Sequence, residues 1–381
     1  MENNNDNKVL NVPHLRFPEF TEEWRSHFLT DFMSFKNGMN PDAKRFGRGT
    51  KFISVMDILN NQFICYDNIR ASVEVMDGDI DTYGVNYGDI LFQRSSETLE
   101  DVGQANVYLD SKPAIFGGFV IRGKSKGNYN PLFFRYLLAS PTARKRIIVK
   151  GAGAQHFNIG QDGLSKVSLD IPCMQEQKKI GELLQCIDAR IATQNKIIEK
   201  LQSLIKGLAV ALTTKEKANI AISQCLECHS STLQESEVLS SGLCKVFGAN
   251  GLVGYKDVPQ MNGDAILVIK DGSGVGTVSY AQGKFSVIGT LNYLTVIGNN
   301  DLRYLYFALS VFNFQPYKTG MAIPHIYFKD YGKAKIYCPS VAEQKRVANV
   351  LDKLESKLFV EQELLASFNQ QKLYLLGKMF I

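Results

Sequence analysis

The sequence predicts an α+β protein in which two domains of mixed α/β structure, in pseudo-twofold arrangement, are joined by two long antiparallel coiled-coil helices. Three observations lead to this prediction. An apolar pattern with heptad spacing covers residues 172–213, and the same pattern returns over residues 339–381. Each pattern follows a segment of short strand-like runs separated by Gly and Asn. The repeated order of mixed segment and long helix indicates two domains built on one frame.

The two apolar seams follow the a and d positions of a coiled coil, with spacings of four and three residues throughout. The offset between them is 167 residues (343 minus 176), measured between the two Glu-Gln-Lys triplets. The first seam consists of Ile180, Leu184, Ile187, Ile191, Gln194, Ile198, Leu201, Ile205, Leu208 and Leu212, and the second of Val347, Leu351, Leu354, Leu358, Glu361, Leu365, Phe368, Lys372, Leu375 and Met379.

A helix of about 40 residues is roughly 60 Å long, too long for a small domain to cover, so each seam is expected to pack against the other. Gln194 and Glu361 occupy the same seam position, where a polar residue either fixes the register of the pair or marks a solvated gap. Ser340 and Glu343 form a predicted capping box at the second helix, whereas Cys173 is a weaker cap for the first.

The composition indicates a folded protein of two or three domains. The chain has 381 residues, of which 45% are hydrophobic and 21% charged, which excludes a disordered chain. The longest apolar runs are too short for a membrane span, and the polar N-terminus lacks the features of a signal peptide, so we expect a cytoplasmic protein without membrane contact. Seven scattered cysteines favour free thiols in a reducing compartment. The net charge of +5 permits a polyanionic partner without requiring one.

The first half begins with a polar, flexible leader over residues 1–12 and an ordered lead-in over 13–24. Strand-like runs are expected at 51–55, 88–92, 105–109 and 118–121. One helix interrupts them, starting at Asn130-Pro131 and ending before Ser140-Pro141. A glycine-rich loop, Gly151 to Ile159, then leads into the first long helix, and residues 213–217 form the linker to the second half.

The second half repeats this plan with different lengths. Gly263-Asp264 corresponds to Gly88-Asp89, residues 301–307 correspond to the short helix, and residues 319–326 correspond to the glycine-rich loop. The offset of 167 holds from Gly153 to Leu212, but the two Gly-Asp pairs differ by 175. The frame therefore repeats while the upstream parts diverge, as expected of a molecule that reads two different short sites.

These residues carry a family resemblance. The lead-in Leu15-Arg16-Phe17-Pro18-Glu19-Phe20 with Trp24, the Pro-x3-Glu-Gln starts at Pro172 and Pro339, and Phe247-Gly248-Ala249-Asn250-Gly251 with Gly254-Tyr255 resemble the specificity subunit of type I restriction-modification systems. The resemblance extends over residues 13–381, and its duplicated order of variable domain and helix is its most specific feature.

The resemblance implies that residues 13–171 and 214–338 are target-recognition domains 1 and 2, each reading half of a bipartite site in double-stranded DNA. It implies that residues 172–213 and 339–381 are spacer helices that dock two methyltransferase subunits. Restriction or translocase subunits would complete the complex. It also implies no catalysis and no cofactor on this chain, with S-adenosylmethionine bound by the methyltransferase partner. Residues 220–243 depart from the family's usual lead-in to the second domain.

Candidate DNA-binding residues come from basic clusters and from polar loops. Lys and Arg contact phosphates, whereas paired donors and acceptors read base edges. A solvated surface or a structural hydrogen bond is the alternative role for each of them. The basic candidates are Arg45, Arg48, Lys51, Arg144, Lys150 and Lys318; the polar-loop candidates are Gln93, Arg94, Ser95, Gln155, His156 and Asn158 in the first half, and Asn250, His325 and Tyr327 in the second.

Three other motifs favour structural interpretations. Cys225-Leu226-Glu227-Cys228-His229 has the haem-attachment pattern but no export signal, and a zinc site there would need a fourth ligand. Residues 271–276 are rich in Gly but precede a strand-like run, so we expect a flexible hairpin, not a phosphate loop. Asn130-Pro131-Leu132-Phe133 differs from the Asn-Pro-Pro-Phe of amino-methyltransferases at its third residue, which favours a helix start.

Two alternative functions remain open at this point. A self-contained DNA methyltransferase would use Asn130 to Phe133 and the Gly272 loop, but it would need a doubly wound parallel sheet, against which the short alternating strands argue. A coiled-coil scaffold without a DNA role would leave unexplained why the frame repeats while its loops differ.

Overall fold

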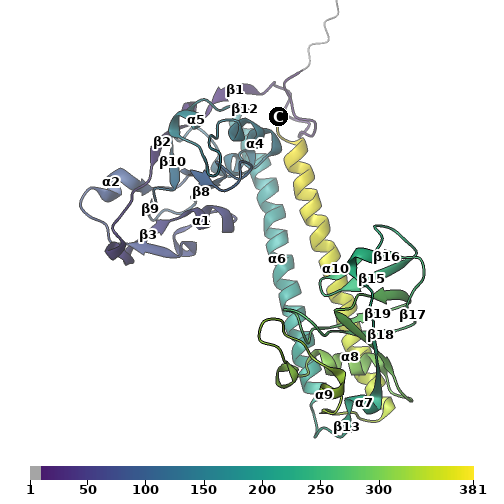
Figure 1. Cartoon of the computed structure of the whole chain (residues 1–381). Helices are drawn as coiled ribbons and strands as arrows, with labels where there is room; N and C mark the ends of the chain where they lie inside the picture. Colours follow the sequence, from purple (N-terminus) through teal and green to yellow (C-terminus); the bar gives the residue numbers. More distant parts are fainter. Residues whose placement is uncertain (1–9) are drawn as a thin grey trace, which may run out of the picture. The chain divides into compact units, whose positions relative to one another are not determined.

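The computed structural model describes residues 10–381, so most of the predicted leader lies outside the described residues. The described chain divides into two compact units. Unit 1 comprises the residues up to Gln194 together with Leu365–Ile381, and unit 2 comprises Asn195–Leu364. Two long helices, α6 (Met174–Thr213) and α10 (Val341–Lys378), contribute to both units (Figure 1). The mixed α+β fold with two long helices confirms the predicted fold class.

Unit 1 contains one antiparallel four-stranded sheet, one mixed four-stranded sheet and two short strand pairs. The antiparallel sheet has the order β2 (Met33–Asn37), β10 (Val120–Ser125), β6 (Ile90–Gln93) and β8 (Ala105–Val107). The mixed sheet has the order β4 (Ala71–Val73), β3 (Phe46–Ile53), β9 (Ala114–Phe116) and β5 (Gly84–Val85), in which β3 and β9 are parallel. The short pairs are β1 (Arg25–Phe28) with β12 (Ser168–Ile171), and β7 (Ser95–Ser96) with β11 (Phe157–Asn158).

Unit 2 repeats the three larger arrangements of unit 1 strand for strand. Its antiparallel sheet has the order β14 (Leu226–Ser230), β21 (Leu291–Val296), β18 (Ala265–Ile269) and β19 (Val278–Ala281). Its mixed sheet has the order β16 (Gly251–Lys256), β15 (Cys244–Gly248), β20 (Lys284–Val287) and β17 (Met261–Asn262), with β15 and β20 parallel. The pair β13 (Ile220–Ala221) with β22 (Lys335–Ile336) corresponds to β1 with β12. The predicted internal repeat is therefore present in the sheet topology.

Short helices connect these strands, and unit 1 has more of them than the sequence predicts. The predicted helix is α3 (Pro131–Leu137), in which Asn130 Oδ1 accepts a hydrogen bond from Phe133 N (2.9 Å), so the helix start at Asn130-Pro131 is confirmed. The expectation of a single helix is wrong. The additional helices are α1 (Val55–Asn60), α2 (Asp79–Tyr83), α4 (Pro141–Ile148) and α5 (Gln161–Ser165), and unit 2 contains α7 (Ile222–Cys225), α8 (Leu302–Ser310) and α9 (Phe328–Tyr331).

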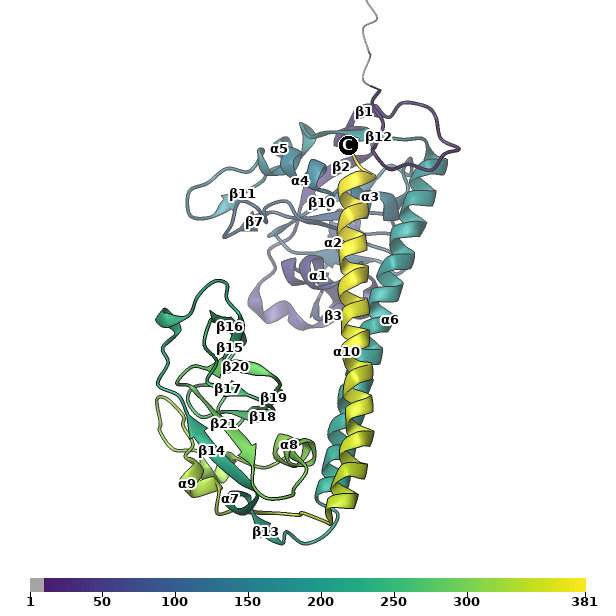
Figure 2. The ribbon, with the colours of Figure 1, turned by 90° about the vertical axis from the view of Figure 1, so that its right-hand side faces the viewer.

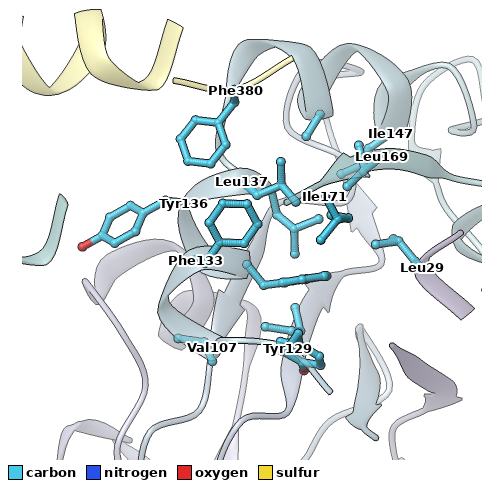
Figure 3. Close-up of a cluster of buried hydrophobic side chains, with 14 of the residues drawn as sticks. Leu29, Val107, Tyr129, Phe133, Tyr136, Leu137, Ile147, Leu169, Ile171 and Phe380 are labelled. Carbon is cyan, nitrogen blue, oxygen red and sulfur yellow. The ribbon is translucent and has the colours of Figure 1, made fainter. Parts of the chain in front are cut away.

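The main core of unit 1 joins the antiparallel sheet to both long helices. Trp24 packs edge-on against Phe133 and Phe380, with ring centroids 6.0 and 6.4 Å apart. Figure 3 shows Phe380, from the segment after α10, beside Phe133 and Leu137 of α3. The same buried cluster includes Ile180, Leu184 and Ile187 of α6, Leu375 and Leu376 of α10, and Met379, which follows α10.

The long helices pack in opposite directions. In unit 1 the beginning of α6 shares a core with the end of α10, whereas in unit 2 the end of α6 contributes Ala209 to a core that contains Val347 and Leu351 from the beginning of α10. All twenty predicted seam positions are buried or half-buried. Gln194 and Glu361 are 5% and 7% exposed, and Lys357 forms an ion pair with Glu361. Both polar seam residues are therefore buried, which argues against a solvated gap at either position, and a role in fixing the register of the pair stays a prediction.

The glutamine of each Glu-Gln-Lys triplet holds the short helix of its unit to the start of the long helix. Gln177 Oε1 accepts a hydrogen bond from Asn130 N (2.9 Å), and its Nε2 donates to Pro172 O (3.0 Å). In unit 2, Gln344 makes the same two bonds, at 2.8 Å each, to the N-cap residue of α8 and to the proline before α10. Both glutamines are buried. The repeated Pro-x3-Glu-Gln motif is therefore a brace that sets each domain on its helix.

The lead-in fastens to the same place in unit 1. Arg16 donates two hydrogen bonds of 2.7 Å to the fully buried carboxylate of Glu176, which raises the pKa of Arg16. Glu19 pairs with Lys179, which lowers the pKa of the Glu19 carboxyl group. At the other long helix, Ser340 Oγ accepts from Glu343 N (3.4 Å), while the Glu343 carboxylate pairs with an arginine one turn later.

Among residues 10–381, no helix combines the length and the apolar character that crossing a membrane would require.

Candidate nucleic-acid interface

In unit 1 the structure brings two of the predicted polar segments together, the one after β6 and the glycine-rich loop. Strand β7 follows the central strand β6, and it pairs with β11 from the glycine-rich loop (Figure 2). Ser95 Oγ donates to Asn158 Oδ1, and Ile159 N donates to Arg94 O (2.9 Å). Gln155, His156 and Asn158 are exposed, whereas Ser95 and Arg94 are half-buried beside them.

The glycine-rich loop of unit 1 has a defined turn. Ala152 and Asn158 exchange two main-chain hydrogen bonds of 2.9 and 2.8 Å, which close the loop at its base. Gly153 has φ +142°, and a Cβ atom there would collide with the carbonyl oxygen of His156. Only glycine fits this close approach. The loop therefore presents the side chains at positions 154–156 from a fixed backbone.

Unit 2 contains the same construction at positions related by 167 residues. Thr319 and His325 exchange main-chain hydrogen bonds of 2.9 and 2.8 Å, and His325 bridges to Asp271 as Asn158 does to Ser95. Gly320 has φ +88°, and a Cβ there would collide with the carbonyl oxygen of Ile323. Both units therefore carry a closed glycine loop beside the end of the central strand of the antiparallel sheet.

A basic residue occupies the end of the central strand in both units. Ile159 N donates to Arg94 O, and Ile326 N donates to Lys270 O, each at 2.9 Å. The main-chain N–H groups also have equivalent partners. Arg94 N donates to Phe119 O, just before β10, and Lys270 N donates to Thr290 O, just before β21, each at 2.9 Å. The offset of 175 residues between the two Gly-Asp pairs aligns Arg94 with Ile269, so the sequence alone did not identify Lys270 as its counterpart. Strand β18 is one residue longer than β6, which accounts for the shift.

The family comparison agrees with this duplication. A family model described as type I restriction modification DNA specificity domain matches residues 21–203 and again residues 229–370. The chain belongs to this family. The predicted resemblance is thereby confirmed over both specificity domains.

Curated relatives are described as specificity subunits of type I restriction enzymes. The putative type I restriction enzyme MjaX specificity subunit of Methanocaldococcus jannaschii is 26% identical over 213 residues, covering 55% of this chain and 49% of that protein. The EcoKI specificity subunit of Escherichia coli is 22% identical over 212 residues, covering 52% of this chain and 45% of that protein. The matches thus span about half the length of these relatives.

Solved structures show the same fold over nearly the whole chain. The S subunit of a type I restriction-modification system from M. genitalium aligns with a TM-score of 0.65 at 17% identity, covering 97% of this chain and 99% of that one. A chain from a structural study of complex assembly and conformational transition of the type I R-M system aligns with a TM-score of 0.57 at 12% identity, covering 96% and 98%.

The basic candidates of the first specificity domain (specificity domain 1, residues 21–203, with residues 229–370 as specificity domain 2) are largely engaged within the domain. Arg45 pairs with Asp79 (2.5 Å), Arg48 pairs with Glu74 (2.7 Å), and Lys51 donates to a main-chain carbonyl (2.7 Å). Their charges are therefore partly neutralised before any ligand arrives. Arg48, with 71% of its side chain exposed, is the best placed of the three for a phosphate.

Two further candidates bond to the segment that follows β6. Gln93 is buried, and its amide donates to Ser95 O (2.9 Å). Arg144 donates to Glu100 O (2.8 Å) and Val102 O (2.7 Å), and burial lowers the pKa of its guanidinium. Both side chains position the segment after β6. The neighbouring Lys150 is exposed and remains a candidate for phosphate contact.

The candidates of specificity domain 2 lie on two loops. Asn250 is exposed in the turn between β15 and β16, and Lys318 is half-buried at the base of the glycine loop. Tyr327 is exposed, and its ring lies beside the ring of His325 with the centroids 5.3 Å apart. Lys329 Nζ lies 5.2 Å from the centroid of the Tyr327 ring. His325 Nδ1 lies 3.0 Å from the carbonyl oxygen of Ile323.

The remaining motifs have structural roles. Residues 271–276 connect the antiparallel strands β18 and β19, so the predicted hairpin is confirmed. His229 stacks on Tyr293 with the centroids 4.8 Å apart and bonds to Thr295 Oγ1 (2.9 Å), while burial raises the pKa of Cys228 to about 11. Within the described part of the chain, no group of three His, Cys, Asp or Glu side chains is placed to hold a metal ion.

Proposed function

We propose that this chain is the DNA-reading subunit of a type I restriction-modification complex, with residues 13–171 and 214–338 each reading one half of a bipartite target. The observation that carries the proposal is the duplicated glycine loop beside a basic strand end. In this proposal Arg94, together with Lys270, whose ammonium group also pairs with Asp271, contacts the DNA backbone, and the side chains at the loop tips read base edges. The family description, a DNA specificity domain, supports this role.

The long helices dock the methyltransferase subunits and set the distance between the half-sites. The supporting observation is apolar surface outside the seam. In unit 2, Phe359, Val360 and Leu364 of α10 are 62%, 58% and 41% exposed, and Ile197 and Leu204 of α6 are 38% and 47% exposed. Exposed apolar side chains grouped on a helix are typical of protein–protein contacts. We propose two methyltransferase subunits as partners, with restriction or translocase subunits joining the assembled complex.

The chain contributes recognition and no catalysis, and the methyltransferase partner binds S-adenosylmethionine. The alternative, a self-contained methyltransferase, would need the side chain of Asn130 to face a substrate. Its Oδ1 instead caps α3, and the neighbouring Phe133 is fully buried. The Gly272 loop closes an antiparallel hairpin, whereas a phosphate loop opens a helix.

Co-expression with the proposed methyltransferase partner, followed by long-read mapping of methylated adenines, tests the proposal. We expect one interrupted motif with two unlike half-sites. A continuous motif, or no methylation from a folded complex, would contradict it. Calorimetry of the chain alone with S-adenosylmethionine provides a second test, because saturable binding would favour the self-contained enzyme.

A further inference from the structure

The two glycine loops share a backbone but present opposite chemistry at their tips. With the offset of 167, Ala154, Gln155 and His156 correspond to Met321, Ala322 and Ile323. Met321 is fully exposed and Ile323 is 65% exposed. Loop 1 (residues 153–157) therefore offers the hydrogen-bonding side chains of Gln155 and His156, whereas loop 2 (residues 320–324) offers the uncovered apolar side chains of Met321 and Ile323, of which Ile323 corresponds to His156.

The apolar tip is held in place from both sides. The paired bonds between Thr319 and His325 close the base of loop 2, and Gly272 N donates to Pro324 O (2.9 Å) from the neighbouring hairpin. The conformation of Gly320 excludes any other residue without a backbone shift. A fixed loop loses little conformational entropy when its side chains become buried against a ligand. Loop 2 is therefore built to present Met321 and Ile323, and their exposure is a property of its backbone.

The surroundings of loop 2 favour DNA as the occupant. Lys318 precedes the loop and Lys329 follows Tyr327, while Lys270, at the strand end that bonds to Ile326, pairs with Asp271. Lysines near an apolar loop tip are complementary to double-stranded DNA, which has an anionic backbone and exposes apolar groups on some base edges. In the major groove, the 5-methyl group of thymine is the apolar feature of the base edges.

We propose that Met321 and Ile323 read thymine methyl groups in the major groove of the half-site that specificity domain 2 recognises. This inference rests on the proposed function and adds a division of labour between the domains. Domain 1 selects its half-site by hydrogen bonds from Gln155 and His156, because the side chain of Asn158 is engaged by Ser95 and by the carbonyl oxygen of His156. Domain 2 obtains part of its selectivity from apolar contact, which a search for hydrogen-bonding residues does not find.

Replacement of thymine by deoxyuridine tests the inference, because it removes only the methyl group. The complex of the full chain with its methyltransferase is titrated with duplexes that carry deoxyuridine at each thymine of the second half-site in turn. We expect about fourfold weaker binding at one or two positions, the effect of losing one buried methyl group. Deoxyuridine in the spacer is the control and should leave the affinity unchanged.

Protein variants identify the side chains responsible. The double variant Met321→Ala, Ile323→Ala should bind thymine and deoxyuridine duplexes equally, whereas Met321→Leu should retain the preference for thymine. Equal affinity of the wild-type complex for all deoxyuridine duplexes would overturn the inference. If those duplexes were neutral while the Ala variants lost affinity and 2-aminopurine reported unstacking, the tip would instead be a wedge between base steps. Failure of the intact complex to bind any duplex would overturn the proposed function itself.

Discussion

Substitution of Gln177 by alanine should destabilise unit 1 by removing the brace between α3 and α6. The side chain is 3% exposed and makes two hydrogen bonds, with Asn130 N (2.9 Å) and Pro172 O (3.0 Å). Each bond contributes about 1 kcal/mol net, and the lost buried methylene contributes about 0.8 kcal/mol. The free energy of unfolding should therefore fall by about 3 kcal/mol.

Urea denaturation followed by the fluorescence of Trp24 measures this change. Trp24 is the chain's single tryptophan, it is 2% exposed, and it packs on Phe133 of the braced helix. With a denaturant slope of about 3 kcal/mol per M, the midpoint should fall by about 1 M. The control is Gln175→Ala, two residues earlier on the same helix, because Gln175 is exposed and its loss should change stability by less than about 0.5 kcal/mol.

The same brace in unit 2 offers an internal comparison. Gln344 is 1% exposed and makes the equivalent bonds, so Gln344→Ala should lower the stability of unit 2 with a much smaller effect on the Trp24 signal. An unmoved Trp24 midpoint in Gln177→Ala would show that the repeated motif does not hold the domain to its helix.

Three further predictions concern function. Arg94→Ala should weaken binding to all DNA sequences alike and reduce the slope of log affinity against log salt by about 0.9, measured by salt titration; a loss confined to one sequence would assign Arg94 to base reading. Insertion of four residues after Gln194 and after Glu361 adds about 6 Å to each helix, so the methylated motif should keep its half-sites and gain one or two unread base pairs; an unchanged gap in an active protein would refute the spacing role. Phe359→Ser, on the exposed face of α10, should weaken co-purification of the methyltransferase without changing the melting temperature, whereas undiminished co-purification would place the docking surface elsewhere.

The long helices could be predicted from the sequence because their signal extends over many turns. The predicted ranges 172–213 and 339–381 agree with α6 and α10 to within three residues at each end. The short helices carry too few residues for such a signal. Ser140-Pro141 ends the predicted helix, yet it also begins α4, where Ser140 Oγ accepts from Ala143 N (3.3 Å). One stop signal and one start signal coincide there.

The candidate site was only partly predictable, because partners distant in sequence decide what a polar side chain does. Arg45 and Arg144 belong to dense basic clusters, but their guanidinium groups are engaged by Asp79 and by the carbonyls of residues 100 and 102. Lys270 was not recognised because the offset of the two Gly-Asp pairs aligns Arg94 with the preceding residue, Ile269. Met321 and Ile323 were not among the sequence candidates, because hydrogen-bonding capacity was the criterion and their exposure is known only from the structure.

The central claim is that each glycine loop reads its own half of the DNA target. Mapping methylated adenines in cells that carry the wild-type chain, the double variant Gln155→Ala, His156→Ala, or the double variant Met321→Ala, Ile323→Ala tests it most directly. Each variant should relax one half-site, a different one for each loop, and leave the other half-site unchanged. An unaltered motif in both variants, or relaxation of both halves by either one, would contradict the claim.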